Sequence, residues 1–244
     1  MIRLQGIKKS FDHPVLRGID LEVPAGCLYG LIGPGASGKS VLLKIITGLI
    51  RPESGKVFID DRDVLAMTDL ELQEFRKRIG MLFQNNALFD FMTVADNIAF
   101  PLRRLFDLSD AEIARRVAER LSCVSLPGFE ERMPAGLSGG QKKRIGVARA
   151  TVIGAPIVLY DEPAAGLDPV TSQRIFNLLR AEQQSSGATV VMVSSDLDRL
   201  LTVTDRIGMM YRGRLIFDGT TEEARASRNP YVHQFVHGVP EGPL

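Results

Sequence analysis

The chain has 244 residues, of which 45% are hydrophobic and 24% charged, and a formal net charge of +1. This is an ordinary globular composition that allows a sizeable core, and the near-neutral charge gives no electrostatic case for nucleic acid or an anionic membrane surface as a partner. No apolar run can span a bilayer, the first residues lack the layout of a signal peptide, and Cys27 and Cys123 are expected to be reduced thiols of a cytosolic protein rather than a disulfide or a metal site.

The first 25 residues predict a small antiparallel sheet. Apolar and polar residues alternate along residues 2–23, and turn-forming residues at 12–14 and 24–26 separate two or three strands. Phe11 lies in the first turn region. Two interpretations of Phe11 stay open: an exposed ring that stacks on a purine base, or a ring folded onto the sheet.

Residues 33–40, here called the phosphate loop, match the pattern G-x-x-x-x-G-K-[ST]. A buried strand is predicted before the loop, at 28–32, and an apolar helix after it. The backbone N–H groups of the loop and the positive end of that helix can face an anion, and the three glycines are expected to allow positive φ. Lys39 can reach the outer phosphates, and the Ser40 hydroxyl can bind Mg²⁺. The predicted phosphate-binding residues are Gly33, Pro34, Gly35, Ala36, Ser37, Gly38, Lys39 and Ser40.

The rest of the chain alternates between strands and helices. Strands are predicted at 56–59, 79–83, 157–160 and 189–193, helices at 69–78 and 169–184, and a hairpin at 209–217. A mostly helical insert runs from about 85 to 150, and the capping-box pattern of Ser109 and Glu112 opens one of its helices. Strands that alternate with helices predict a parallel α/β core.

Asp161 and Glu162 follow the strand at 157–160, at the sheet edge where open α/β folds bind their ligands. Asp161 can hold Mg²⁺, through water or together with Ser40. Glu162 can polarise a water molecule that attacks the outermost phosphate. Acidic pairs at strand ends are also common as exposed surface residues without a catalytic role. The catalytic interpretation therefore depends on the phosphate loop upstream.

Residues 137–141, here called the signature segment, read Leu-Ser-Gly-Gly-Gln, and a helix with basic residues at 142, 143, 144 and 149 follows. Ser138, Gly139 and Gly140 can expose backbone N–H groups, which repeats the anion-site pattern of the phosphate loop. A helix start with a serine cap explains Ser138, but not two successive glycines, which destabilise a helix.

Together these motifs resemble the ATP-binding subunit of ABC transporters over nearly the whole chain. The resemblance implies the ABC nucleotide-binding fold: an α/β P-loop NTPase core with a mainly parallel sheet, an N-terminal antiparallel β subdomain and a helical insert. It implies an ATPase domain at 1–222, with the helical subdomain at about 85–150, and a C-terminal tail at 223–244.

The resemblance also implies roles for single residues. Phe11 is expected to stack on adenine, and Asp168 belongs to the D-loop while also capping the next helix. Gln84 is expected to touch Mg²⁺ and the lytic water and to sense the membrane partner. The cofactors are ATP and Mg²⁺, with further ATP contacts from Ser138, Gly139, Gly140 and Gln141, catalytic roles for Glu162, Gln84 and Ser195, and metal ligation by Ser40, Gln84 and Asp161.

The implied mechanism needs two copies of the chain. They face head to tail as a homodimer and sandwich two ATP molecules, each between the phosphate loop of one copy and residues 138–140 of the other. ATP closes the dimer, hydrolysis opens it, and the motion drives an integral-membrane permease. The expected location is peripheral, on the cytoplasmic face of the inner membrane.

One position departs from the family. A histidine usually follows the strand that ends here at Val193, where it donates a hydrogen bond to the γ-phosphate; this chain has Ser195. Serine can donate, but it is shorter and cannot become cationic. Because one transition-state donor is worth about 10²–10³ in rate, the hypothesis is that the chain binds ATP and dimerises normally but hydrolyses ATP slowly.

Residues 82–102 and the tail at 234–243 resemble the ATPase of Mla-type (MCE-associated) lipid-trafficking transporters of Gram-negative envelopes. The implied cargo is phospholipid, and the implied partners are an Mla-type permease, a periplasmic MCE-type lipid-binding subunit and a small cytoplasmic accessory subunit. The ATPase of another ABC transporter and an ATP-gated clamp with slow turnover remain as alternatives. Two structural questions also stay open: whether the side chains at 89–92 form a docking patch or pack internally, and whether the helix at 231–236 covers its own core or the other subunit.

Overall fold

The computed structural model describes all residues, 1–244, and is built around a six-stranded sheet. Its strand order is β10-β9-β3-β8-β7-β6; only β10 runs antiparallel to its neighbour. The predicted parallel core is therefore confirmed. The strands are β3 (Leu28–Ile32), β6 (Ile79–Leu82), β7 (Ile157–Asp161), β8 (Thr189–Val193), β9 (Arg206–Tyr211) and β10 (Arg214–Thr220).

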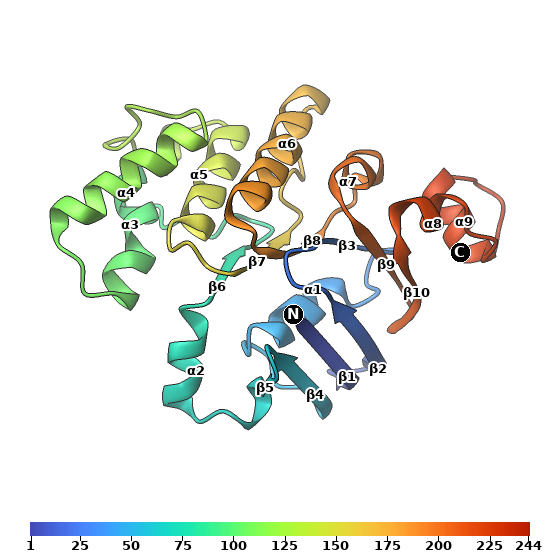
Figure 1. Ribbon diagram of the computed structural model, residues 1–244. Helices are drawn as coiled ribbons and strands as arrows, with labels where there is room; N and C mark the ends of the chain where they lie inside the picture. Colours follow the sequence, from blue (N-terminus) through green and yellow to red (C-terminus); the bar gives the residue numbers. More distant parts are fainter.

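A second, four-stranded antiparallel sheet lies below the first in Figure 1. Its order is β2-β1-β4-β5, and the central strand β1 pairs Ile2 with Val23 on one side and with Ile59 on the other. The turn at residues 60–61 has positive φ at both positions, the geometry of a two-residue hairpin. The strands are β1 (Ile2–Ser10), β2 (Pro14–Val23), β4 (Ser54–Ile59) and β5 (Arg62–Asp63).

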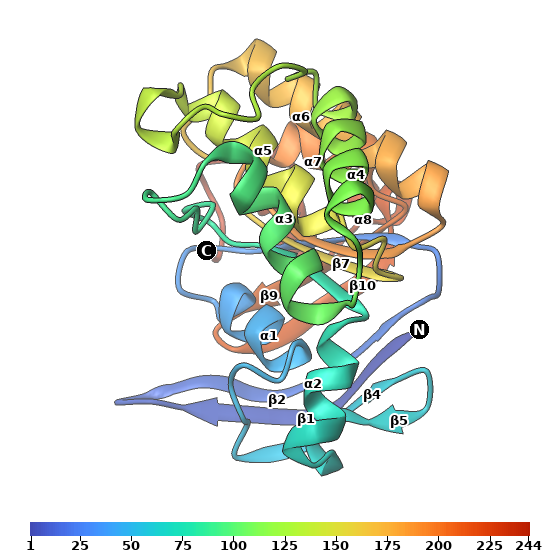
Figure 2. The same ribbon diagram turned by 90° about the vertical axis from the view of Figure 1, so that its left-hand side faces the viewer.

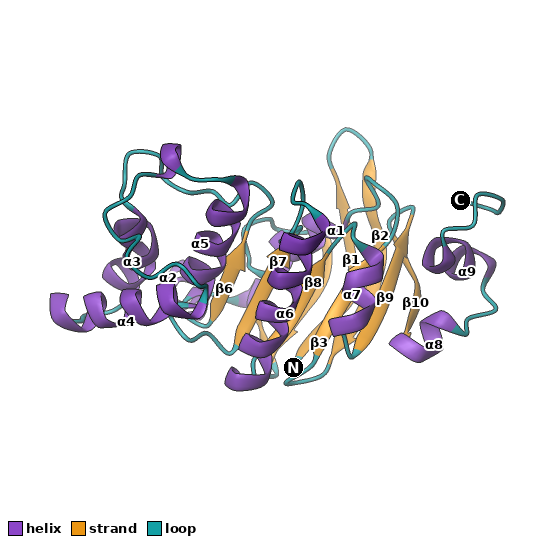
Figure 3. Ribbon diagram, turned by 90° about the horizontal axis from the view of Figure 1, so that it is seen from above, coloured by secondary structure: helices purple, strands orange, loops and turns teal.

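Helices cover both faces of the six-stranded sheet. Figure 3 shows α6 and α7 lying across one face, and in Figure 1 α1 lies on the opposite face, between the two sheets. Figure 2 shows α3, α4 and α5 grouped to one side. The helices are α1 (Lys39–Ile46), α2 (Asp69–Arg76), α3 (Val94–Leu105), α4 (Asp110–Cys123), α5 (Gly139–Thr151), α6 (Pro169–Ser186), α7 (Leu197–Val203), α8 (Thr221–Arg225) and α9 (Pro230–His237), with short 3₁₀ turns at Val64–Ala66 and Pro134–Gly136.

The side chains of the central strands divide between two hydrophobic cores. In β7, Ile157 and Leu159 belong to the core that includes the antiparallel sheet and α1, whereas Val158 and Tyr160 belong to the core under α6 and the insert. This alternation is the period of two expected for a strand buried on both faces. None of the helices combines the length and the apolar character that a membrane span requires.

The helical insert follows the sequence prediction with one correction. The stripe of Ile113, Val117 and Leu121 on α4 is buried, as its spacing predicts. Ser109 caps α4 by accepting the N–H of Glu112, but the Glu112 carboxylate does not return the bond, so the predicted capping box is only half formed. It instead accepts hydrogen bonds from arginines at 115 and 116, whose charged guanidinium groups are stronger donors than a backbone N–H.

The C-terminal helix α9 packs on its own chain. Val232 and Val236 are buried in the core that lies under α6 and the insert. The ring of Tyr231 lies 4.9 Å from that of Tyr211 in β9. The apolar spacing of α9 therefore serves the core of the same molecule.

Candidate functional site

The phosphate loop connects the carboxyl end of β3 to the first turn of α1. Gly33 has φ 139°, and a Cβ there would lie 2.0 Å from the carbonyl oxygen of Met210, so only glycine fits. Gly38 has φ 101°, and a Cβ there would lie 2.6 Å from the Leu16 side chain. The expectation for Gly35 was wrong: its φ is not positive, and Ala36 adopts the left-handed conformation instead, with φ 58°. The loop therefore bends at Ala36.

Lys39 folds back over the phosphate loop. Its Nζ donates to the carbonyl oxygens of Gly33 and Pro34, at 2.7 and 2.8 Å, and to the Ser37 hydroxyl. Burial lowers the pKa of Lys39, while Glu162 and Asp161 raise it. The ammonium group thus lies at the loop that the sequence predicts to bind phosphate.

Phe11 lies beside the phosphate loop across a shallow cavity. The cavity has a volume of about 260 Å³ and is lined by Phe11, His13, Val15 and residues 36–41. The Phe11 ring is 56% exposed, which favours the stacking interpretation over a ring folded onto the sheet. An exposed aromatic next to a phosphate-binding loop is suited to hold a base while the loop holds its phosphates.

Ser40 and Asp161 meet at the start of α1 and the end of β7. The Ser40 hydroxyl donates to Asp161 Oδ1 at 3.0 Å. Asp161 is only 3% exposed, and burial raises its pKa, an effect partly offset by the Ser40 hydrogen bond and three nearby lysines. Adjacent hydroxyl and carboxylate oxygens are the hard donors that Mg²⁺ prefers, so these two residues fit a magnesium ion.

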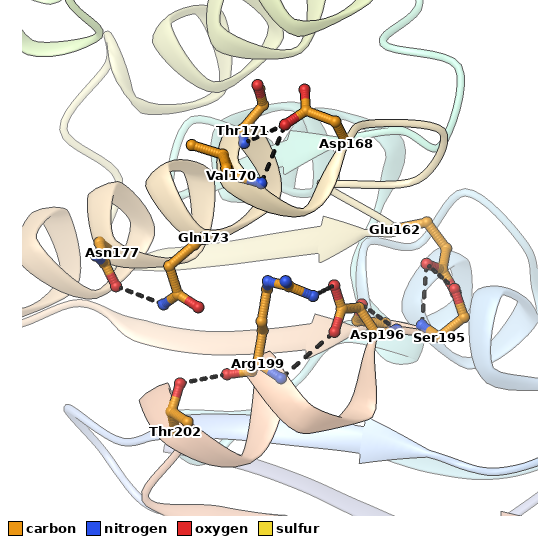
Figure 4. A network of polar contacts seen from close by, with 11 residues as sticks. Glu162, Asp168, Val170, Thr171, Gln173, Asn177, Ser195, Asp196, Arg199 and Thr202 are labelled. Carbon is orange, nitrogen blue, oxygen red and sulfur yellow. Dashed lines mark hydrogen bonds and ion pairs between the residues drawn. The ribbon is translucent and has the colours of Figure 1, made fainter.

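Glu162 is held by the residue that replaces the family histidine. Both the backbone N–H and the hydroxyl of Ser195 donate to Glu162 Oε2, each at 3.0 Å (Figure 4). Glu162 itself has φ 52°, an uncommon conformation for a residue with a side chain, and its N–H donates to the carbonyl of Val193. The Ser195 hydroxyl, expected to face a phosphate, therefore contacts the predicted catalytic carboxylate.

Gln84 follows β6 and its side chain is exposed. Its backbone carbonyl accepts a hydrogen bond from Lys143 at 2.5 Å, and the same ammonium group donates to the carbonyl of Glu162 at 3.0 Å. The Lys143 ammonium group therefore bridges the backbones of Gln84 and Glu162, which lie 78 positions apart in the sequence (162 − 84).

The signature segment opens α5 with a complete capping box. Ser138 accepts the N–H of Gln141, and the Gln141 side chain accepts the N–H of Ser138. A Cβ on Gly140 would lie 3.0 Å from Thr171, but one on exposed Gly139 would meet nothing closer than 3.8 Å. The fold of one chain therefore gives no reason for glycine at 139, and the signature segment does not line the cavity at the phosphate loop.

Three of the four basic residues after the signature segment, at 143, 144 and 149, are engaged within the fold. Lys143 is 5% exposed, Arg144 donates to the carbonyls of residues 124 and 125, and Arg149 donates to those of residues 86 and 87. Sequence reasoning missed the structural use of these side chains. A signal was present, since Lys143 lies on the helical stripe of buried Val147 and Ala150.

Asp168 caps α6. One carboxylate oxygen accepts the N–H groups of Val170 and Thr171, each at 3.0 Å (Figure 4). Hydrogen bonding to the side chain of Thr171, and then to these N–H groups, lowers the pKa of Asp168. The residue therefore performs the predicted capping role and remains on the exposed surface.

A phosphate loop between a strand and a helix, with its serine hydrogen-bonded to an aspartate at the end of β7, defines a P-loop nucleotide-binding protein. The sequence profile described as ABC transporter matches residues 16–165. The chain belongs to this family; it is the ATP-binding subunit of an ABC transporter and an ATPase.

Relatives match the chain over most of its length. A probable ribonucleotide transport ATP-binding protein, mkl, of Mycobacterium leprae is 40% identical over all of this chain and 70% of its own. The intermembrane phospholipid transport system ATP-binding protein MlaF of Haemophilus influenzae is 34% identical over 97% of this chain and 89% of its own. The ATP-binding cassette MJ0796, solved as a post-hydrolysis dimer with ADP and Pi, superposes with a TM-score of 0.85 at 31% identity, covering 91% of this chain and 99% of its own.

Proposed function

We propose that the chain works as one half of a head-to-tail homodimer that binds two ATP molecules between its subunits. The supporting observation is that Ser138 and Gly139 of the signature segment are exposed at the start of α5, apart from the cavity at the phosphate loop. Gly139 has free space around it, so a partner or ligand can approach its backbone closely. The dimeric state of the related cassette MJ0796 also supports this arrangement.

Within each half-site, the residues divide the work as follows. Lys39 and the phosphate-loop N–H groups bind the phosphates, and Phe11 stacks on the base. Ser40 and Asp161 would hold Mg²⁺, with Gln84 completing the set, and the ion would neutralise charge on the phosphates. Glu162 accepts a proton from the attacking water and orients it, because its carboxylate lies at the sheet edge that Asp161 shares.

Ser195 makes this ATPase slow. In the family pattern a histidine donates to the γ-phosphate, whereas here both donors of Ser195 bind Glu162. The carboxylate is thereby held in place, but the outermost phosphate lacks that donor during the reaction. This contact also favours the second candidate function, an ATP-gated clamp with little turnover.

We propose that a cytoplasmic helix of a membrane permease docks between β6, α3 and α5, which puts the chain at the cytoplasmic face of the inner membrane as a peripheral subunit. An apolar cavity of about 280 Å³ there is lined by Phe83, Phe89 and Phe100, among others. The Phe91 ring beside it is 76% exposed and lies 5.8 Å from that of Phe89. The predicted patch is thus partly internal, through Phe89, and partly available, through Phe91.

Phospholipid is the cargo we propose, moved through an Mla-type permease with MCE-type and accessory subunits. The likeness of residues 82–102 and 234–243 to Mla-type ATPases supports it, as does MlaF. The chloroplastic protein TRIGALACTOSYLDIACYLGLYCEROL 3 of Arabidopsis thaliana, 35% identical, has a glycolipid in its name, which supports a lipid cargo only in general. The names of mkl and of the methionine import protein MetN of Caulobacter vibrioides, 39% identical, instead indicate other cargoes.

A complementation experiment tests the shared site. Lys39→Ala and Gly139→Asp each damage both sites of a homodimer. When the two variants are mixed, a heterodimer retains one site built from an intact phosphate loop and an intact signature segment. We expect each variant alone to release little phosphate from MgATP and the mixture to recover activity. A mixture that stays as inactive as its components contradicts the head-to-tail site.

The cargo is tested separately. The chain is isolated with its membrane partners in detergent, and the bound lipids are identified by mass spectrometry. Enrichment of phospholipid over the surrounding membrane supports the assignment, and isolation with an amino-acid or nucleotide permease alone contradicts it.

A further inference from the structure

Lys143 is a buried cation that none of the roles described so far uses. It lies in the second turn of α5, is 5% exposed, and forms no ion pair with a carboxylate. Its Nζ instead donates to the backbone carbonyls of Gln84 and Glu162, at 2.5 and 3.0 Å. Burial lowers the pKa of Lys143, whereas the charges of Glu162 and Asp161 raise it.

The burial of Lys143 needs a reason, because taking an ammonium group out of water is costly unless it is well bonded. An apolar side chain would pack on the stripe of Val147 and Ala150 without that cost. What lysine adds is the ability to donate two hydrogen bonds to two loops at once. Both loops carry predicted catalytic side chains, at Gln84 and Glu162.

One of these loops is strained. Glu162 has φ 52°, a left-handed conformation that is strained for a residue with a side chain. Such a conformation persists only where neighbours hold it. Val193 accepts its N–H, Ser195 holds its carboxylate, and its carbonyl accepts hydrogen bonds from Lys143 and from the N–H of Ala165. Of these contacts, only the one from Lys143 comes from the helical insert.

We propose that Lys143 is a positioning residue for ATP hydrolysis: it fixes the strained backbone of Glu162 and the backbone of Gln84 against α5. The inference rests on the catalytic roles proposed above for Glu162 and Gln84. Because the Lys143 Nζ donates to the backbone carbonyls of Gln84 and Glu162, it acts through these two residues. Its loss therefore affects the rate of the chemical step more than the binding of ATP, which depends on the phosphate loop.

The test compares Lys143→Met with Lys143→Gln. Methionine keeps the length of the aliphatic part of lysine and removes the ammonium donors, while glutamine keeps uncharged N–H donors. Thr151→Val is the matched control, because it removes buried hydrogen bonds from the Thr151 hydroxyl to carbonyls of the same helix, away from the catalytic loops. For each variant, kcat and KM for MgATP are measured, with the folded fraction determined by thermal unfolding and rates expressed per folded molecule.

We expect Lys143→Met to lower kcat by about tenfold to a hundredfold with KM within about twofold of wild type, since a small misplacement of a catalytic group has effects of this size. Lys143→Gln should lie between methionine and wild type, and Thr151→Val should keep the wild-type kcat. Equal kcat in Lys143→Met and Thr151→Val overturns the inference, and so does a rise in KM without a fall in kcat.

A further variant separates this inference from the proposed function. If Glu162→Gln hydrolyses ATP at the wild-type rate, the catalytic role of Glu162 is wrong, and the inference falls with it. If Glu162→Gln is inactive while Lys143→Met is as fast as wild type, only the role of Lys143 is wrong.

Discussion

Replacing Ser195 by histidine should make this ATPase faster. Ser195 holds Glu162 through two donors, its backbone N–H and its hydroxyl, both 3.0 Å from the same carboxylate oxygen. The backbone N–H remains in any variant without proline, so Glu162 keeps one of its two contacts. A longer imidazole at 195 can then extend past the carboxylate to the outermost phosphate.

The expected magnitudes follow from these contacts. A hydrogen bond to a charged group contributes about 1.5–3 kcal/mol when buried, and Ser195 is exposed, so about 1 kcal/mol is appropriate for its hydroxyl. Ser195→Ala should therefore lower kcat by about fivefold. A well-placed donor in the transition state is worth about 10²–10³ in rate, so Ser195→His should raise kcat by at least about tenfold.

The assay is steady-state phosphate release from MgATP, with Glu162→Gln as the blank. Equilibrium binding of ATP should not differ between wild type and the two Ser195 variants. Ser185→His, at an exposed serine near the end of α6, controls for an added surface histidine. If Ser195→His is no faster than wild type, the serine is compensated elsewhere and the reasoning on Ser195 fails.

Four further outcomes are expected. Ser40→Ala should weaken ATP binding about tenfold or more when Mg²⁺ is present, but not when EDTA removes the ion. The affinity of the wild type for MgATP should fall as the pH is lowered, because burial raises the pKa of Asp161 and protons then compete with the ion for its carboxylate. Gly80→Ala should lower the free energy of unfolding by more than about 3 kcal/mol in urea titrations, since its Cβ would lie 2.0 Å from a carbonyl of α5, whereas Gly136→Ala, in open space, should not. Phe91→Ser should leave the basal ATPase rate unchanged and weaken permease binding in detergent about tenfold.

The arrangement of the core was predictable because it depends on local patterns. Short, mostly apolar runs such as 28–32 and 189–193 favour strands buried on both faces, and both are strands with these bounds. The position of Asp161 follows, because a residue at the carboxyl end of one parallel strand lies near the loop that follows another. The contact between Ser40 and Asp161 was therefore expected before any coordinates.

Other features depend on neighbours that are distant in the sequence. No local pattern shows that Gly35 avoids positive φ while Ala36 adopts it, since the whole loop decides which residue bends. Glu112 fits a capping box, but two arginines one turn away compete for its carboxylate and win. The donors of Lys143 have acceptors 59 and 19 positions away, and only the folded chain brings these together.

The contacts of Glu162 connect the two ATP sites of the proposed dimer. Its carboxylate is held by Ser195 at the end of β8, and its carbonyl by Lys143 of α5. In the proposed dimer, the first turn of α5 presents Ser138 and Gly139 to the nucleotide of the other subunit. When the dimer closes on the ATP of one subunit, a shift of α5 in the opposite subunit therefore acts through Lys143 on Glu162. This Glu162 is the catalytic carboxylate for the second ATP. If Ser195 slows hydrolysis as proposed, this link would make closure of the complete dimer the step that decides when ATP is hydrolysed.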